Sequence, residues 1–142
     1  MIEAVRRAKD TGITMSVMVI LGLGGVEGGE KHALETARVL SEMNPDYVGA
    51  LTLRLVPGTP LYQDWKQCRF SLISSLQSLT ELKTIIEKSI FTNCFFSSMH
   101  ASNYVAIRGR LPEEKLRMED ELRHIIVEAN LSSLRPDFMR GL

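Results

Sequence analysis

Two long apolar runs, each followed by a glycine-rich turn, dominate the hydrophobic pattern of this chain. The first covers residues 15–21 and the second residues 47–56, and both are rich in aliphatic side chains. Runs of this length and composition are typical of strands buried on both faces of a parallel sheet. One helix-length segment, residues 29–43, lies between them. Strand, helix and strand at this spacing predict a βαβ unit with two parallel strands.

Helical periodicity marks the segments before and between these two strands. Apolar residues recur at helical spacing from Ile2 to Ala8, and Gly12 is placed to end that helix. The helix over residues 29–43 is expected to end at Asn44-Pro45, because proline disfavours a helical conformation in the residue before it. Its predicted sheet-facing stripe consists of Ala33, Thr36, Ala37 and Leu40.

Two further helices and one more strand are predicted in the second half of the chain. Ser78-Leu-Thr-Glu81 has the pattern of a capping box, which predicts a helix that begins at this point. Residues 90–96 have the composition of a strand, and Gly109-Arg-Leu-Pro112 predicts a last helix with proline in its first position. The expected inward faces are Leu79, Leu82, Ile85 and Ile86 in the first helix, and Met118, Leu122, Ile125, Ile126 and Ala129 in the last. The predicted order is α-β-α-β-α-β-α, an α/β fold.

Composition and charge exclude several classes of protein. The 142 residues are 44% hydrophobic and 24% charged, which is ordinary for one globular domain. Basic and acidic residues balance at 17 each, so no net charge favours nucleic acid or an anionic membrane. No apolar stretch reaches the roughly 20 residues of a membrane span, and residues 1–7 do not form a signal peptide. Two cysteines, Cys68 and Cys94, form no disulfide framework, which favours the cytoplasm.

The first helix begins at Met1 with no capping residue before it, and three strands make a thin sheet for an α/β fold. Both features predict that the strands of a longer protein are missing from the N-terminal side; a native N-terminal helix with a frayed first turn is the alternative. Missing neighbours would leave an apolar sheet edge near Val17, Val19 and Leu21. The chain is therefore expected to self-associate through that edge.

The candidate chemistry lies at two elbows that follow the apolar runs. In parallel α/β sheets, ligands bind beyond the carboxyl ends of the strands. The first elbow, Gly22-Leu-Gly-Gly25, supplies two glycines of a dinucleotide-binding fingerprint, but Glu27 occupies the sixth position, where that fingerprint needs glycine. A tight strand-to-helix turn also explains these glycines without any ligand. The second elbow, Val56-Pro-Gly-Thr-Pro60, lies one βαβ unit away, so both elbows are expected on the same sheet edge.

Several segments, in this order and spacing, resemble the C-terminal half of a radical S-adenosylmethionine (radical SAM) enzyme of the group like oxygen-independent coproporphyrinogen oxidase. Ile20-Leu-Gly-Leu-Gly-Gly25 is similar to the fifth-strand motif of that family. Residues 44–61, which include Asn44-Pro-Asp-Tyr47 and end in Val-Pro-Gly-Thr-Pro-Leu61, are similar to its sixth strand and following loop. Residues 78–86 and 100–112 resemble the close of the domain. The resemblance covers residues 1–128 and leaves 129–142 as a tail.

The resemblance implies an architecture and a chemistry. The architecture is the C-terminal part of a partial (β/α)6 TIM-type barrel, with a β-α closing segment. In the family's reaction, a [4Fe-4S] cluster reduces S-adenosylmethionine, and the resulting 5′-deoxyadenosyl radical abstracts hydrogen from a substrate. The glycines would let the backbone approach the cofactor, and the two aliphatic side chains would contact its adenine. The implied cofactor-binding residues are Ile20, Gly22, Gly24, Gly25 and Val56.

The chain departs from the family at the cluster. The family holds its cluster with three cysteines of one Cys-x-x-x-Cys-x-x-Cys loop, whereas Cys68 and Cys94 are the only cysteines here. The cluster-binding half is therefore absent from this chain, no metal ligand is assigned, and the chain alone is expected to be inactive. The sequence assigns neither a catalytic residue nor a substrate, whether small molecule or macromolecule.

Two other functions remain open. One is a non-catalytic α/β module that packs against a partner chain, and the other, less favoured, is a Rossmann-type dinucleotide binder. The segment His100-Ala-Ser-Asn103 has two interpretations as well, because its side chains are all hydrogen-bonding types apart from Ala101. It is either a turn that faces a substrate or, the favoured interpretation, a turn whose side chains satisfy their own backbone.

Overall fold

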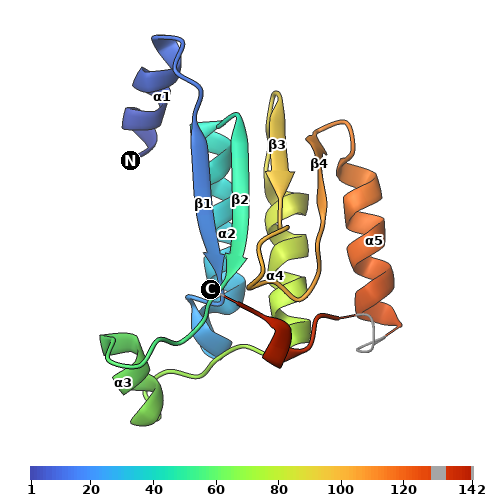
Figure 1. Ribbon diagram of the computed structural model, residues 1–142. Coiled ribbons are helices and arrows are strands. Elements are labelled where there is room, and N and C mark those ends of the chain that lie inside the picture. Colours follow the sequence, from blue (N-terminus) through green and yellow to red (C-terminus); the bar gives the residue numbers. More distant parts are fainter. Residues whose placement is uncertain (129–133, 142) are drawn as a thin grey trace.

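A four-stranded sheet with helices on one face is the framework of the computed structural model, which describes residues 1–128 and 134–141 (Figure 1). The strands lie in the order β1-β2-β3-β4. β1, β2 and β3 are parallel, and β4 runs antiparallel to β3. Their bounds are Ser16–Leu21 for β1, Tyr47–Thr52 for β2, Cys94–Ser97 for β3 and Arg108–Leu111 for β4. The predicted α/β class and the parallel pairing of the first two strands are confirmed.

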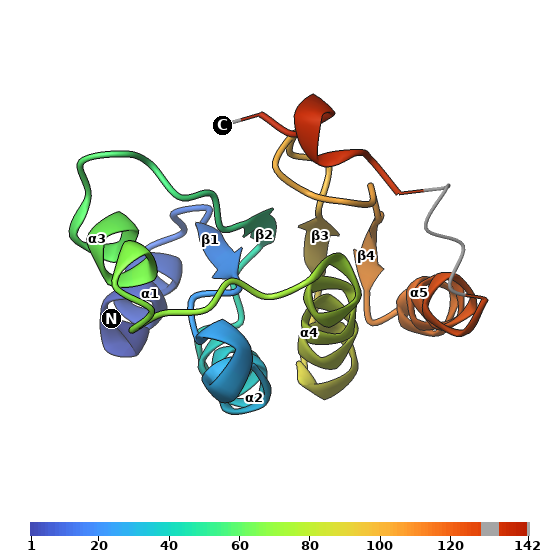
Figure 2. The same ribbon diagram turned by 90° about the horizontal axis from the view of Figure 1, so that it is seen from below.

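Three long helices cover one face of this sheet (Figure 2). In chain order, α2 follows β1, α4 precedes β3 and α5 follows β4. α1 lies beyond the amino end of β1, and α3 lies beyond the carboxyl ends of the parallel strands (Figure 1). The helices are α1 Ile2–Asp10, α2 Gly25–Met43, α3 Pro60–Lys66, α4 Ser75–Lys88, α5 Lys115–Val127 and the short 3₁₀ helix η2 Asp137–Met139.

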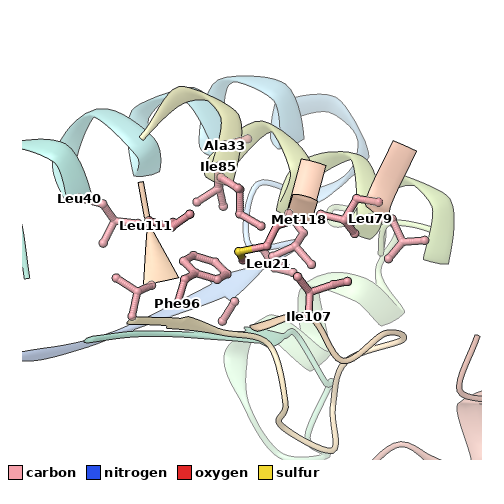
Figure 3. Packing of buried hydrophobic residues seen from close by; sticks show 14 of the residues in the cluster. Leu21, Ala33, Leu40, Leu79, Ile85, Phe96, Ile107, Leu111 and Met118 are labelled. Atoms are coloured by element: carbon pink, nitrogen blue, oxygen red, sulfur yellow. The ribbon is translucent and has the colours of Figure 1, made fainter. Parts of the chain in front are cut away.

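The core lies between the sheet and these helices, where alternate strand residues meet the helix stripes (Figure 3). Phe96 of β3 and Leu111 of β4 are fully buried against residues such as Ile85 of α4 and Met118 of α5. The predicted inward residues of α2 are confirmed for Ala33, Ala37 and Leu40, and those of α4 for all four positions. In α5, Met118 and Leu122 are buried and Ile125 and Ile126 are half-buried, whereas Ala129 lies outside the described residues.

The predicted ends of the first two helices are also confirmed. α1 ends at Thr11, and Gly12 follows with a φ of +83°, a conformation that glycine adopts without steric cost. Asn44 ends α2 in the left-handed conformation, with its N–H bonded to the carbonyl of Leu40. None of the helices in residues 1–128 and 134–141 combines the length and the apolar character that crossing a bilayer requires.

The predicted last helix is present as α5, but the prediction that Pro112 takes its first position is wrong. Arg108–Leu111 instead forms a fourth strand, and α5 begins three residues after Pro112, at Lys115. The reason is a two-residue alternation in which Gly109 and Leu111 face the core while the flanking arginines face outward. A pattern only four residues long is too short to identify a strand from sequence.

The capping box at Ser78 is also wrong, because the same motif occurs one turn earlier. Ser74 caps α4, accepting a hydrogen bond from the N–H of Gln77, whose side chain bonds back to the Ser74 N–H. Ser78 and Glu81 are therefore buried inside the helix and face other partners. Helix α3 was not predicted at all, although Thr59 as N-cap followed by proline is a helix-start signal.

β1 is one of the two edge strands of the sheet, as expected, but its exposed side chains differ from the predicted ones. Val17 and Val19 are half-buried and Leu21 is buried, because all three face the helices. Met18 and Ile20 point to the other face of the sheet, where Met18 is 61% exposed. An apolar groove of about 390 Å³ runs along this edge between β1 and α2. The edge carries no lysine or proline that would discourage another strand from pairing with it.

We therefore predict that the chain self-associates through β1 and that Met18→Lys shifts it toward monomer. A lysine on an edge strand opposes pairing with a second strand, since its charge would have to be buried. Light scattering across a range of concentrations measures the effect. Leu116→Lys is the matched control, because Leu116 is 76% exposed on α5, far from the edge. A wild-type chain that stays monomeric at high concentration contradicts the prediction.

Candidate functional site

Both predicted elbows follow the carboxyl ends of parallel strands, but the second strand is shorter than the predicted residues 47–56. It ends at Thr52, so the second elbow begins four residues further along the chain. β1 and β2 pair in register through Leu21 and Thr52, and the pairing extends one residue further because the Leu53 N–H bonds to the Leu21 carbonyl at 2.9 Å. Gly22 and Gly25 have φ values of +87° and +62°, so the turn from β1 into α2 uses a conformation that favours glycine at both positions.

A buried carboxyl group ties the first elbow to α4. The N–H of Gly22 donates to Oε2 of Glu81 at 2.8 Å, and the other oxygen of Glu81 contacts Nδ1 of His32 on α2. Glu81 is only 4% exposed. A carboxyl group that accepts from a backbone N–H and a ring nitrogen has the partners that burial demands. This contact joins three elements, the β1–α2 turn, α2 and α4, beneath the elbow.

The glycines of the first elbow are covered by the chain itself. A Cβ at Gly22 would lie 3.0 Å from Ile73, and a Cβ at Gly25 would lie 3.1 Å from Phe70. The segment that supplies these contacts also accepts the N–H of Val26 at the Ser71 carbonyl, at 3.1 Å. Close packing against residues 70–73 therefore explains why both positions are glycine, without any ligand.

Gly24 has a different neighbour. A Cβ there would lie 2.7 Å from the carbonyl oxygen of Gly28, within the first turn of α2. A larger residue at this position, such as the Gly24→Val variant, would disturb the start of α2. Loss of ligand binding in such a variant would therefore not identify a cofactor contact.

The five residues implied by the family resemblance do not line one cavity. The glycines lie in the covered turn. Ile20 is 39% exposed on the face of the sheet opposite the helices, and Val56 is 40% exposed in the loop after β2. These two aliphatic side chains are the members of the set that remain accessible to a ligand.

A cleft of about 840 Å³ lies beside the second elbow. Its walls come from the loop after β2, from α3, from the N-terminus of α4 and from η2, which meet at the carboxyl end of the sheet (Figure 2). Arg54, Tyr62, Trp65, Tyr104 and Arg140 contribute polar and aromatic groups. Sequence reasoning missed this cleft because α3 and η2 were not predicted as elements.

Arg140 forms one wall of the cleft and is 7% exposed. Its Nε donates to the Ser102 carbonyl at 2.7 Å, its guanidinium lies 3.7 Å from the centre of the Tyr104 ring, and it pairs with Asp137. Burial raises the pKa of the Tyr104 hydroxyl above its ordinary value. This phenol therefore stays protonated at neutral pH and acts in the cleft as a neutral polar group.

A buried polar junction of Thr52, Ser102 and Asn103 lies between the carboxyl ends of β2 and β3. The side-chain amide of Asn103 donates to the carbonyls of Ala50 and Ser98, at 2.7 and 2.8 Å, and its oxygen accepts from the Thr52 hydroxyl at 2.8 Å. The Thr52 N–H donates to the Ser102 hydroxyl at 3.1 Å. Asn103 thus takes the place of a backbone ladder where the two strands separate.

The segment His100–Asn103 is therefore a structural turn, in line with the favoured interpretation, although its side chains bond mainly to β2 and to the end of β3 rather than to the turn alone. Ser102 and Asn103 are both 2% exposed. Nδ1 of His100 lies 2.9 Å from the Ser102 hydroxyl and accepts the N–H of the same residue at 3.2 Å. All three polar side chains have partners inside the protein.

Over residues 1–128 and 134–141, no group of three or more histidine, cysteine or acidic side chains is arranged to hold a metal ion. Cys68 is exposed beyond α3, and Cys94 is buried in β3. Burial raises the pKa of the Cys94 thiol to about 11, so its thiolate is scarce at neutral pH. The two thiols thus differ in accessibility as well as position.

Comparisons with family models, with curated proteins and with solved structures give no match to this chain.

We predict that Asn103→Ala lowers the free energy of unfolding by about 2 to 4 kcal/mol, because it leaves the buried Ala50 and Ser98 carbonyls without their donor. Chemical denaturation of both proteins measures this difference. Asn93→Ala is the control: Asn93 is exposed and bonds only to exposed Arg110, so its change should stay within about 0.5 kcal/mol. Equal losses in the two variants would show that the junction contributes no special stability.

Proposed function

We propose that this chain supplies part of the S-adenosylmethionine site of a radical SAM enzyme, as a section of a partial (β/α)6 barrel. One observation carries the proposal: the two elbow motifs follow neighbouring parallel strands, and these strands end at the same level of the sheet, with Leu21 paired to Thr52. The first elbow begins directly after β1 and the second begins four residues after the end of β2, so the chain enters both elbows from the carboxyl edge of the sheet.

The arrangement of layers supports the barrel interpretation. α2, α4 and α5 cover the same face of the sheet (Figure 2). The opposite face of β1 carries exposed Met18 and Ile20. In a (β/α) barrel the helices form the outer ring, and the uncovered strand face points to the interior. In that arrangement Ile20 would face the barrel interior near its carboxyl end.

The described residues fit the cofactor in part. Ile20 and Val56 are accessible aliphatic side chains and would hold the adenine by apolar contact. The elbow glycines would fix the path of the backbone, because residues 70–73 already fill the space beside Gly22 and Gly25. When bound in a complete enzyme, S-adenosylmethionine supplies the hydrogen-abstracting group, and this chain's contribution is to bind and orient the adenosyl part.

The cysteines do not fit the cluster. Cys68 and Cys94 are the only cysteines, one is exposed and the other is buried in β3. A cluster of this family needs three thiolates in one loop. No step of the reaction is therefore assigned to this chain alone.

We predict weak binding of S-adenosylmethionine that Val56→Asp reduces by about tenfold, because a carboxylate would replace the apolar contact with adenine. Equilibrium dialysis with labelled S-adenosylmethionine measures both affinities. Val127→Asp is the control, since Val127 is also an exposed valine, at 75%, but lies on α5, apart from both elbows. If the wild-type chain shows no binding, or if both variants bind equally well, the assignment of Val56 fails.

The chain should also assemble no [4Fe-4S] cluster. Anaerobic reconstitution with iron and sulfide, followed by iron analysis and absorbance in the thiolate-to-iron charge-transfer region, tests this expectation. At most one thiol, that of Cys68, is accessible in the folded protein. One cluster per monomer, or release of 5′-deoxyadenosine after reduction, would refute the view that the cluster half is absent.

A second function, that of a non-catalytic interaction module, is favoured by the open β1 edge and its apolar groove. An edge of this kind pairs readily with a strand of another chain. The Rossmann alternative has less support, because Glu27 lies in the first turn of α2, where its negative charge opposes a bound pyrophosphate. Dialysis with a dinucleotide in place of S-adenosylmethionine separates these alternatives.

A further inference from the structure

The cleft beside the second elbow contains a guanidinium without a carboxylate partner among the described residues. Arg54 leaves the end of β2 and is half-buried. Within residues 1–128 and 134–141 its one hydrogen bond runs from Nη1 to the carbonyl of Asp137 at 3.4 Å, which is long for such a bond. A half-buried guanidinium with one weak neutral acceptor retains most of its capacity to bind an anion.

The other charged groups of the cleft leave it positive. Arg140 and Asp137 also line it, and they pair with each other. Arg54 therefore adds a cation that no carboxylate of the lining balances. Ser74 and Ser75, at the N-terminus of α4, line the same cleft, and the dipole of this helix adds to the positive potential without itself defining a site.

A pair of aromatic rings faces the same space. Tyr62 and Trp65 lie three residues apart on α3, with ring centres 5.5 Å apart and planes inclined by 43°. Trp65, the one tryptophan of the chain, is 41% exposed. With Leu72 they form an apolar wall in a cleft of about 840 Å³, which exceeds the needs of a single ring.

We propose that this cleft binds a small aromatic anion, whose carboxylate or phosphate pairs with Arg54 and whose ring lies against Tyr62 and Trp65. Arginine suits both groups because its planar fork donates two parallel hydrogen bonds to either. The rings supply apolar and stacking contact for the flat part of the ligand. This site goes beyond the proposed function: neither Ile20 nor Val56 lines the cleft, so either proposal can fail while the other stands.

Trp65 provides the measurement, because all tryptophan fluorescence of the protein comes from the cleft. The full chain is titrated with phenyl phosphate, with phenylacetate and with phenylacetamide, the uncharged counterpart of phenylacetate. Binding of both anions, with the amide weaker by about tenfold, is the expected result, since loss of a charge-assisted pair has that effect. Comparing the two anions shows whether phosphate or carboxylate is preferred.

Three variants test whether Arg54 is the cation that pairs with the anion. Arg54→Gln should weaken binding of the anions by about tenfold and leave the affinity for phenylacetamide unchanged. Arg54→Lys keeps the charge and guards against a folding defect, and it should retain intermediate affinity. Arg69→Gln is the matched control, because Arg69 is an exposed cation four residues from Trp65 that already pairs with Asp64. The proposal is overturned if no anion binds, if the amide binds as well as phenylacetate, or if both arginine positions have equal effects.

Discussion

The carboxyl end of the sheet depends on one side chain, Asn103, which holds together two strands that no longer pair through their backbones. β2 and β3 are paired only from Tyr47 to Gly49, and beyond that point β3 ends at Ser97 while β2 continues. Separating strands leave carbonyl groups without donors inside the protein, which is costly. The Asn103 amide satisfies one carbonyl on each side of the gap and its oxygen takes up the Thr52 hydroxyl.

The cleft follows from this junction. Because Thr52 is held by Asn103 and Ser102, the chain leaves β2 at a fixed position, and residues 53–55 enter the cleft wall from there. Arg140 is held in turn by the carbonyl of Ser102. The polar network that closes the gap in the sheet thus also places two of the cleft's walls. Its buried side chains all have partners: within the described chain, the one buried side-chain N or O atom without a partner is Ser89 Oγ, which lies outside this network at the C-terminus of α4.

The sequence was most informative where a physical pattern repeats over many residues. The parallel pair β1 and β2, the burial of Ile85 and Ile86 and the end of α2 at Asn44 all follow from period, apolar content and backbone preference. Short or ambiguous signals failed. β4 has only four residues, and two consecutive capping patterns, at residues 74–77 and 78–81, both fit the start of a helix. The choice between them is made by tertiary contacts, since the buried Ser78 and Glu81 bond to β2 and to the first elbow.

The candidate site was harder to predict, because it is built from residues distant in sequence. The two elbows and the sheet edge that they share were predicted. The residues that cover the glycines, 70–73, and the helix η2, which lines the cleft more than eighty residues after Arg54, were not. An arginine in a strand-like run carries no sign that it will lack a carboxylate partner. Such a property emerges only when several elements meet at the end of the sheet.

Because of the contact between Gly22 and Glu81, the sequence of residues 56–69 can vary more freely than that of the sheet and its covering helices. This contact fixes the first elbow to α4 directly, across 59 positions, without using the excursion through α3. Residues 56–69 therefore begin and end on a framework that does not need them for its own alignment, much as a loop is grafted between two anchored stems. Natural variation in this excursion would alter the aromatic wall of the cleft while the sheet and its covering helices stay in place.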